Sequence, residues 1–197
     1  SDVAAIRGES RYKTAQETYH DKVGTPELIP SDDPQAIFDR GHIMEDRVAD
    51  AFLKLTDFHR IPETRMFRSK KYPHMTANID AIVQAKDGRL FVFEAKTTVA
   101  ENYDAWKDGK VPRSYIPQTR QYPAVLDDDR IMGTYIGCLF IVDLIVGGLY
   151  VGSAYSGEQF VARCIERDKL EENEQLEDGE KWWMTYVVLN EEPEASG

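Results

Sequence analysis

The sequence lacks a long apolar run. Its most hydrophobic stretch, 135–151, is interrupted by Asp143 and by the pair Gly147 and Gly148, whereas a membrane-spanning helix needs about 18 or more apolar residues in succession. We therefore expect a soluble protein without a membrane segment, and without a signal peptide at the given N-terminus.

Cysteine is also scarce. Cys138 and Cys164 are the two cysteines, and they lie 26 positions apart with no Cys-x-x-Cys spacing and no histidine cluster beside either. Neither a zinc site nor a disulfide framework is indicated by this pattern. We expect two buried thiols in a reducing cytosol.

Basic residues are in the minority, with 24 against 35 acidic ones and a net charge of -11. The segment 166–194 holds eleven acidic residues against three basic ones, so most of the excess lies there. By contrast, 60–71 holds five basic residues against Glu63 alone. This basic stripe has two open interpretations, a solvated surface or a contact with phosphate groups.

The remaining organisation predicts one domain over 1–197. A chain of this length closes one sizeable core, and no linker divides it.

We expect helices ending near Gly8 and Gly24, the second opened by a capping box at Thr14 and Glu17. Further helices are expected at 35–55 and 114–126, with Pro123 awkward inside the latter, and in the acidic segment 166–190, followed by a few disordered residues. Strands are expected at 64–68, 76–84, 89–97, 133–146, 149–156 and 160–166. This order predicts an α/β (α+β) fold with a central mixed sheet flanked by helices.

The stretch FVFEAKTT raises the question of chemistry, because it sets two opposite charges in an apolar strand. Alternation places Val92, Glu94 and Lys96 on one face and Phe91 and Phe93 on the other, so the strand should be central and covered on both sides. The two charges then lie at its far end. An ion pair alone would contribute about 0 to 1 kcal/mol and is the simplest alternative.

Two further acids favour a metal site. A hairpin through the Asp-Gly turn would bring Asp80 beside Glu94, and two such carboxylates repel each other unless a divalent cation lies between them. Mg²⁺ takes oxygen ligands and keeps waters for a substrate, and the backbone carbonyl of Ala95 would add an oxygen. Glu45 is the one charged residue on the inward face of the helix GHIMEDRVADAF. Lys96 would orient the attacking water and offset charge at a phosphate.

These residues resemble the PD-(D/E)xK nuclease superfamily, with Asp80 as the first acid and Glu94-Ala95-Lys96 as the (D/E)xK element. Within it the chain resembles the YqaJ-type viral recombinase family, which includes lambda-type phage exonucleases. The resemblance covers roughly 1–183 and rests on SDVAAIRGESRYKT, RGHIMED, HMTANIDAIV, the Glu-x-Lys element and QTRQY. The last resembles the Gln-x-x-x-Tyr element of RecB-type nucleases.

The resemblance implies a restriction-endonuclease-like core and a Mg²⁺-dependent DNA nuclease, with Mn²⁺ as a substitute and no iron–sulfur cluster. Glu45, Asp80 and Glu94 would hold the metal and Lys96 would assist the water. Gln118 and Tyr122 would line the active site, and Ser1 and Arg11 would contact a DNA phosphate.

The expected function is exonuclease action on linear duplex DNA during phage-type recombination, in the cytoplasm of a bacterial host or in a prophage context. A single-strand annealing protein and further copies of the chain are the expected partners besides DNA. Two alternatives stay open. One is a non-catalytic DNA- or protein-binding domain that keeps the nuclease fold. The other is a structural protein in which Glu94 and Lys96 merely pair.

Overall fold

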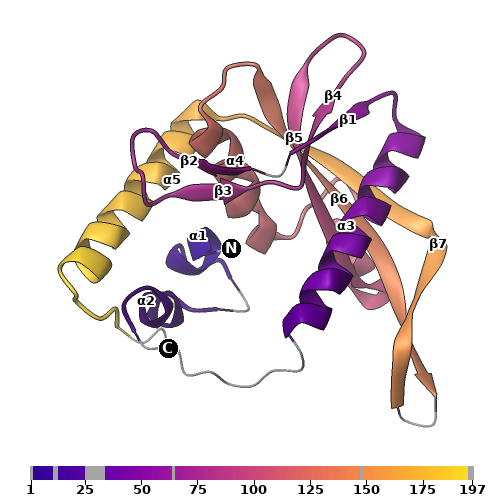
Figure 1. Ribbon diagram of the computed structural model, residues 1–197, viewed down its shortest axis with the longest axis horizontal. Coiled ribbons are helices and arrows are strands. Elements are labelled where there is room, and N and C mark those ends of the chain that lie inside the picture. The colour runs from indigo at the N-terminus through magenta and orange to yellow at the C-terminus, as the bar shows by residue number, and fades with distance from the viewer. Residues whose placement is uncertain (1, 11–12, 25–33, 64, 147–148, 195–197) are drawn as a thin grey trace.

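The strand that carries Glu94 lies at the centre of a five-stranded sheet (Figure 1). The computed structural model of the protein describes residues 2–10, 13–24, 34–63, 65–146 and 149–194. Its helices are α1 (Asp2–Ile6), α2 (Ala15–Val23), α3 (Pro34–Leu55), α4 (Ile116–Leu126) and α5 (Lys169–Trp182), with 3₁₀ turns at Ala100–Trp106 and Arg113–Tyr115 and a π-helical turn at Trp183–Val188. Its strands are β1 (His59–Pro62), β2 (Met66–Arg68), β3 (Thr76–Asn78), β4 (Ala81–Gln84), β5 (Leu90–Val99), β6 (Ile131–Val146) and β7 (Leu149–Glu166).

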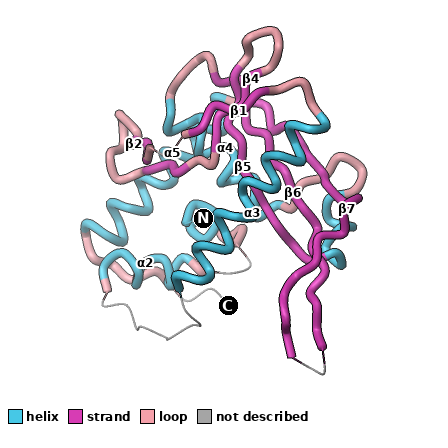
Figure 2. Tube along the Cα trace, turned by 45° about the vertical axis from the view of Figure 1, so that its right-hand side comes forward, coloured by secondary structure: helices cyan, strands magenta, loops and turns pink. Residues whose placement is uncertain are grey.

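The sheet is mixed, as the sequence predicts. Its strand order is β1-β4-β5-β6-β7, in which β5 and β6 run parallel and the other neighbours run antiparallel. β6 and β7 form one long hairpin whose far half extends beyond the other strands (Figures 1 and 2). The strand expected at 160–166 is therefore continuous with β7.

Helices cover both faces of this sheet. On one face, Val48 and Phe52 of α3 pack against Phe91 and Phe93 of β5. On the other face, Val92 packs in a second cluster with residues of α4 and α5. Burial of aromatic and branched side chains on both faces is the main stabilising contribution, and it fixes β5 as the central strand.

Two expected elements are corrected by the structure. The expected strand 76–84 is two strands, because the chain leaves the pairing of β3 with β2 at Ile79 and Asp80 and joins the main sheet as β4. The acidic segment becomes helical only at Lys169, where the Asp168 side chain accepts hydrogen bonds from two backbone N–H groups. Glu166 is the last residue of β7, and Arg167 and Asp168 connect this strand to the helix. The strand β1 was not expected from the sequence.

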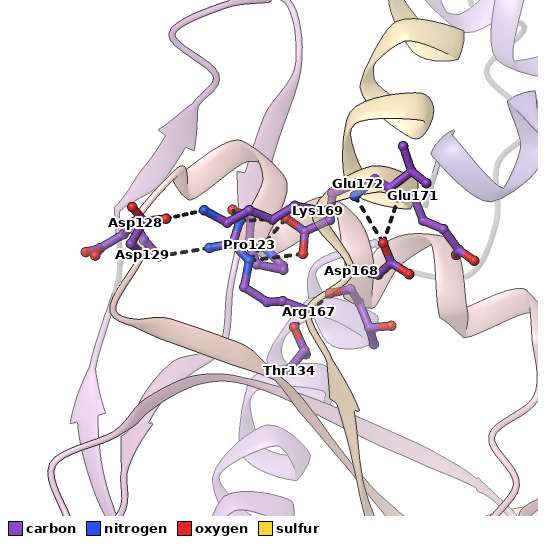
Figure 3. A network of polar contacts seen from close by, with 11 residues as sticks. Pro123, Asp128, Asp129, Thr134, Arg167, Asp168, Lys169, Glu171 and Glu172 are labelled. Atoms are coloured by element: carbon purple, nitrogen blue, oxygen red, sulfur yellow. Dashed lines mark hydrogen bonds and ion pairs between the residues drawn. The ribbon is translucent and has the colours of Figure 1, made fainter.

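Helix α4 continues through Pro123. A side chain of the sheet bonds the backbone carbonyl that this proline leaves without an N–H donor, and a side chain after β7 bonds carbonyls at the end of the helix. Proline has no N–H for the carbonyl of Thr119, and the Thr134 hydroxyl donates to that carbonyl instead, at 2.7 Å. At the end of the helix, Arg167 donates to the carbonyls of Pro123 and Asp128 and pairs with the buried Glu172 (Figure 3). Hydrogen bonds therefore connect α4 both to β6 and to the segment that follows β7.

The expected capping box of α2 is present, since the backbone N–H of Thr14 donates to Glu17 at 2.7 Å and the Thr14 hydroxyl accepts from the Glu17 N–H at 3.1 Å. Cys138 is buried and Cys164 half-buried, and both are free thiols. Among the described residues, no helix combines the length and the apolar character that crossing a membrane requires.

Candidate active site

The pairing of β4 with β5 brings Asp80 beside Glu94. Ala81 lies opposite Phe93 in this antiparallel pair, so the residue before Ala81 meets the residue after Phe93. Asp80 contacts β5 directly, because its carboxylate accepts a hydrogen bond from the backbone N–H of Ala95, the residue after Glu94, at 2.7 Å. The predicted juxtaposition across the Asp-Gly hairpin is confirmed.

Glu94 is the centre of the polar cluster and is only 3% exposed. Its Oε1 accepts hydrogen bonds from the Lys96 ammonium and from Gln118 Nε2, the latter at 2.9 Å, and its Oε2 accepts from the Tyr122 hydroxyl at 2.6 Å. Gln118 also contacts the Tyr122 hydroxyl. A buried carboxylate needs such donors, because its desolvation is otherwise very costly. The Gln-x-x-x-Tyr pair of α4 thus reaches the Glu-x-Lys element of β5.

Lys96 stays charged in this setting. Burial alone would lower the pKa of Lys96, but the charge of Glu94 and the hydrogen bond to it raise that pKa above its usual value. An ammonium group held in place can stabilise negative charge that develops on a phosphate. It is a poor proton acceptor at neutral pH.

Asp80 is the perturbed carboxyl group of the cluster. Burial, and next the charge of Glu94, raise the pKa of Asp80 from 3.8 to about 7, while the hydrogen bond from Ala95 opposes that rise. Glu45 contributes to the same effect from α3, so its carboxylate lies within electrostatic range of Asp80. Two carboxylates that disfavour each other's charge are a typical setting for a divalent cation.

Glu45 occupies the position expected from the helical spacing. Its neighbours Val48 and Phe52 are buried, Asp46 and Asp50 are exposed, and Glu45 itself is half-buried. However, the described residues contain no group of three or more His, Cys, Asp or Glu side chains placed to hold one metal ion together. The structure therefore places Asp80 beside Glu94, whereas the ligand roles of Glu45, Asp80, Glu94 and the Ala95 carbonyl stay predictions.

Ser1 and Arg11, the expected phosphate contacts, lie outside the described residues. Tyr115 is a site residue that the sequence reasoning missed. Its ring centroid lies 5.5 Å from the Lys96 ammonium and 5.7 Å from the ring of the buried Trp106. Its position about one helical turn before Gln118 is the feature of the sequence that could have indicated its place at the site.

A cavity of about 370 Å³ adjoins the cluster on the side of α4. Gln118 and Tyr122 form part of its wall, together with Asn78 of β3, Trp182 at the end of α5 and Trp183 after it. The Trp183 ring stacks on His74 with centroids 4.6 Å apart. The polar cluster therefore opens toward a space large enough for a small ligand.

A mixed sheet with helices on both faces, carrying Asp80 immediately before β4 and a Glu-x-Lys element on the adjacent β5, defines a protein of the PD-(D/E)xK class. Residues 1–128 match the family model described as the YqaJ-like viral recombinase domain. The chain belongs to this family, and the resemblance noted in the sequence is confirmed.

One curated relative is the "Uncharacterized protein YqaJ" of Bacillus subtilis (strain 168), which is 31% identical over 168 residues. The match spans 85% of this chain but 46% of the relative, so the chain spans about half the length of the curated relative it matches.

Two solved structures share the fold. The crystal structure of LHK-Exo in complex with dAMP has a TM-score of 0.65 at 17% identity, covering 95% of this chain and 86% of that one. The alkaline exonuclease LHK-Exo from Laribacter hongkongensis has a TM-score of 0.60 at 14% identity, covering 94% of this chain and 85% of that one. At sequence identities this low, the two structural matches establish the fold alone.

Proposed function

We propose that this protein is a metal-dependent deoxyribonuclease that degrades linear duplex DNA from its ends. The observation that carries the proposal is the buried Glu94, which joins Lys96, Gln118 and Tyr122 and lies beside Asp80. The viral recombinase family and the exonuclease fold support it. DNA ends produced in phage-type recombination are the substrate that this membership favours, and an annealing protein is the partner it suggests.

The carboxylates fit a divalent cation such as Mg²⁺. The pKa of Asp80 rises to about 7 mainly through burial and the charge of Glu94, and a cation between the two groups would remove this conflict. Asp80, Glu94 and the Ala95 carbonyl would hold it, and Glu45 is the further ligand that the family resemblance implies. When bound, Mg²⁺ supplies Lewis-acid chemistry and lowers the pKa of a bound water.

The chain's own residues would position the phosphodiester and its charge. The Lys96 ammonium faces the cluster and would donate to the phosphate or to the attacking water. Gln118 and Tyr122 hold the Glu94 carboxylate in one orientation through 2.9 Å and 2.6 Å hydrogen bonds. Held in place by this rigid support, the ligands would keep the geometry that the transition state requires.

The test is cleavage of linear duplex DNA by purified protein with Mg²⁺, compared with a chelator. Lys96→Ala should lower the rate by about a hundredfold or more, whereas Lys86→Ala removes an exposed lysine at the far end of β4 and should leave it unchanged. Covalently closed circular DNA should resist cleavage. Equal rates for Lys96→Ala and the unaltered protein would refute the proposal.

A second candidate is a DNA- or protein-binding domain that keeps the nuclease fold without catalysis. It is favoured by the lack, among the described residues, of a three-residue metal cluster, and by the fact that both Glu94 oxygens already accept hydrogen bonds. Calorimetric titration with Mn²⁺ separates the two. Binding that disappears in Asp80→Asn supports the nuclease, and no binding supports the second candidate.

A further inference from the structure

The basic stripe of the sequence (60–71) begins on β1, where Arg60 pairs with Asp46 at 2.6 Å, and continues through β2 into the segment that follows it. Of its members, Arg65 pairs with Glu63 at 2.6 Å and Lys71 lies 3.6 Å from Glu177. Arg68 and Lys70 are exposed, and neither has an ion pair or hydrogen bond with any residue that the structure describes. These two cations are therefore available to an external anion.

The acidic helix α5 lies near this stripe, but many of its carboxylates are already paired. Basic side chains just after α1, just after β7, on α4 and in the β2–β3 connection meet it: Arg7 with Asp178, Arg167 with Glu172, Arg120 with Glu171, Lys71 with Glu177 and, when protonated, His74 with Glu180. Pairing of this kind offsets the local negative field. The net charge of -11 consequently says little about the field at Arg68 and Lys70.

The pairing of β2 with β3, here called the β2–β3 ribbon (66–78), orients Arg68, and Lys70 lies in the connection between the two strands. Phe67 turns inward and packs against the core cluster that contains Val92, so its neighbours Met66 and Arg68 turn outward by strand alternation. Arg68 lies opposite Thr76. Thr76 precedes Asp80 by four residues, a span of at most roughly 13 Å in an extended chain.

We propose that the outward face of the β2–β3 ribbon, through Arg68 and Lys70, binds the phosphodiester backbone of DNA a few nucleotides from the scissile phosphate. The spacing is bounded by the roughly 13 Å limit on the separation of Thr76 and Asp80, at a rise of about 3.4 Å per nucleotide along a strand. This inference rests on the proposed function for the position of the cleaved bond. Such contacts hold the substrate in register and carry no base specificity.

The experiment measures DNA binding by fluorescence anisotropy in EDTA over a series of salt concentrations, so that no cleavage interferes. Arg68→Gln combined with Lys70→Gln should weaken duplex binding roughly tenfold at low salt and reduce the slope of log K against log salt by about 1.8. The matched control is Lys54→Gln combined with Lys86→Gln, which also removes two exposed positive charges and should change neither quantity. An unchanged slope in the Arg68/Lys70 variant, or an equal change in the control, overturns the inference.

Position is tested with a duplex that carries neutral methylphosphonates three to five nucleotides from its end. The modification should weaken binding by the unaltered protein and have no effect on the Arg68/Lys70 variant. Equal weakening of both proteins contradicts the assigned position. If the variant instead changes the sedimentation of the protein without DNA, the face binds a second copy and the inference is wrong.

Failure of the proposed function and failure of the binding-face inference give different experimental results. A protein that binds DNA through Arg68 and Lys70 but never cleaves it refutes the nuclease and leaves the binding face in place. Conversely, cleavage at saturating DNA should proceed at the same kcat in the Arg68/Lys70 variant, because neither residue belongs to the Glu94 cluster.

Discussion

Replacing Asp80 by asparagine should stabilise the metal-free protein at alkaline pH. The Asp80 carboxyl has its pKa raised from 3.8 to about 7 by burial and the charge of Glu94, so the folded state disfavours its charged form. A group with a higher pKa when folded lowers the free energy of unfolding progressively as pH rises from about 4 to about 7. Asparagine carries no charge and keeps an oxygen that accepts the Ala95 N–H.

The magnitude follows from the difference between the two pKa values. A difference of about 3 corresponds to about 4 kcal/mol above pH 7, and partial access of solvent to Asp80 reduces this to about 2 kcal/mol. For a chain of this size, about 2 kcal/mol raises Tm by roughly 4–8 °C. At pH 5 the gain should fall to less than half, because Asp80 is then mostly protonated in the folded protein.

Thermal unfolding in a chelator at pH 5 and pH 8 measures both values. Asp57→Asn is the control, since its side chain is 77% exposed and its replacement should have no effect. Saturating Mg²⁺ should reverse the order at pH 8, because a ligand that binds only the folded state stabilises it by about 2.7 kcal/mol at one hundred times Kd. A variant that is no more stable than the unaltered protein at pH 8, or whose gain is the same at pH 5, refutes the reasoning.

Four other substitutions test contacts around the site. Tyr122→Phe removes the hydroxyl that donates to the central carboxylate and should lower kcat about tenfold; an unchanged pH–rate profile and kcat would contradict this. Tyr115→Leu removes the ring that faces the Lys96 ammonium and should lower kcat about three- to tenfold with KM unchanged. Thr134→Val leaves a buried carbonyl of α4 unsatisfied and should cost about 1–3 kcal/mol in urea unfolding, whereas Thr134→Ser should not. Glu172→Gln leaves the buried Arg167 guanidinium without its charged partner and should cost about 3 kcal/mol by the same measurement.

Local signals in the sequence were sufficient for much of the site. The Asp-Gly turn and strand alternation placed Asp80 beside Glu94, and this was confirmed by the pairing of Ala81 with Phe93. Helical spacing placed Glu45 on the same side of α3 as Val48 and Phe52. Each of these predictions depends on the geometry of one helix or one hairpin, which short-range sequence patterns determine.

The features that escaped prediction depend on contacts between distant segments. The strand breaks at Ile79 because the chain pairs with β2 before this point and with β1 and β5 after it. No proline or glycine marks the change. The strand β1 is a four-residue edge strand whose side chains are mostly exposed, so it lacks an alternating apolar pattern. The ring of Tyr115 faces Lys96 only once α4 has packed beside β5.

Pro123 shows how a residue that breaks a local rule can support the site. Its missing N–H frees the carbonyl of Thr119, and Thr134 of β6 donates to that carbonyl at 2.7 Å. Thr134 is in turn paired with Val92 on β5, two residues before Glu94. The helix that supplies Gln118 and Tyr122 is thus fastened to the strand pair that supplies the carboxylate. A regular helix at this point would satisfy this carbonyl internally, whereas the proline leaves it to Thr134, and this bond favours the fixed separation that the Glu94 hydrogen bonds require.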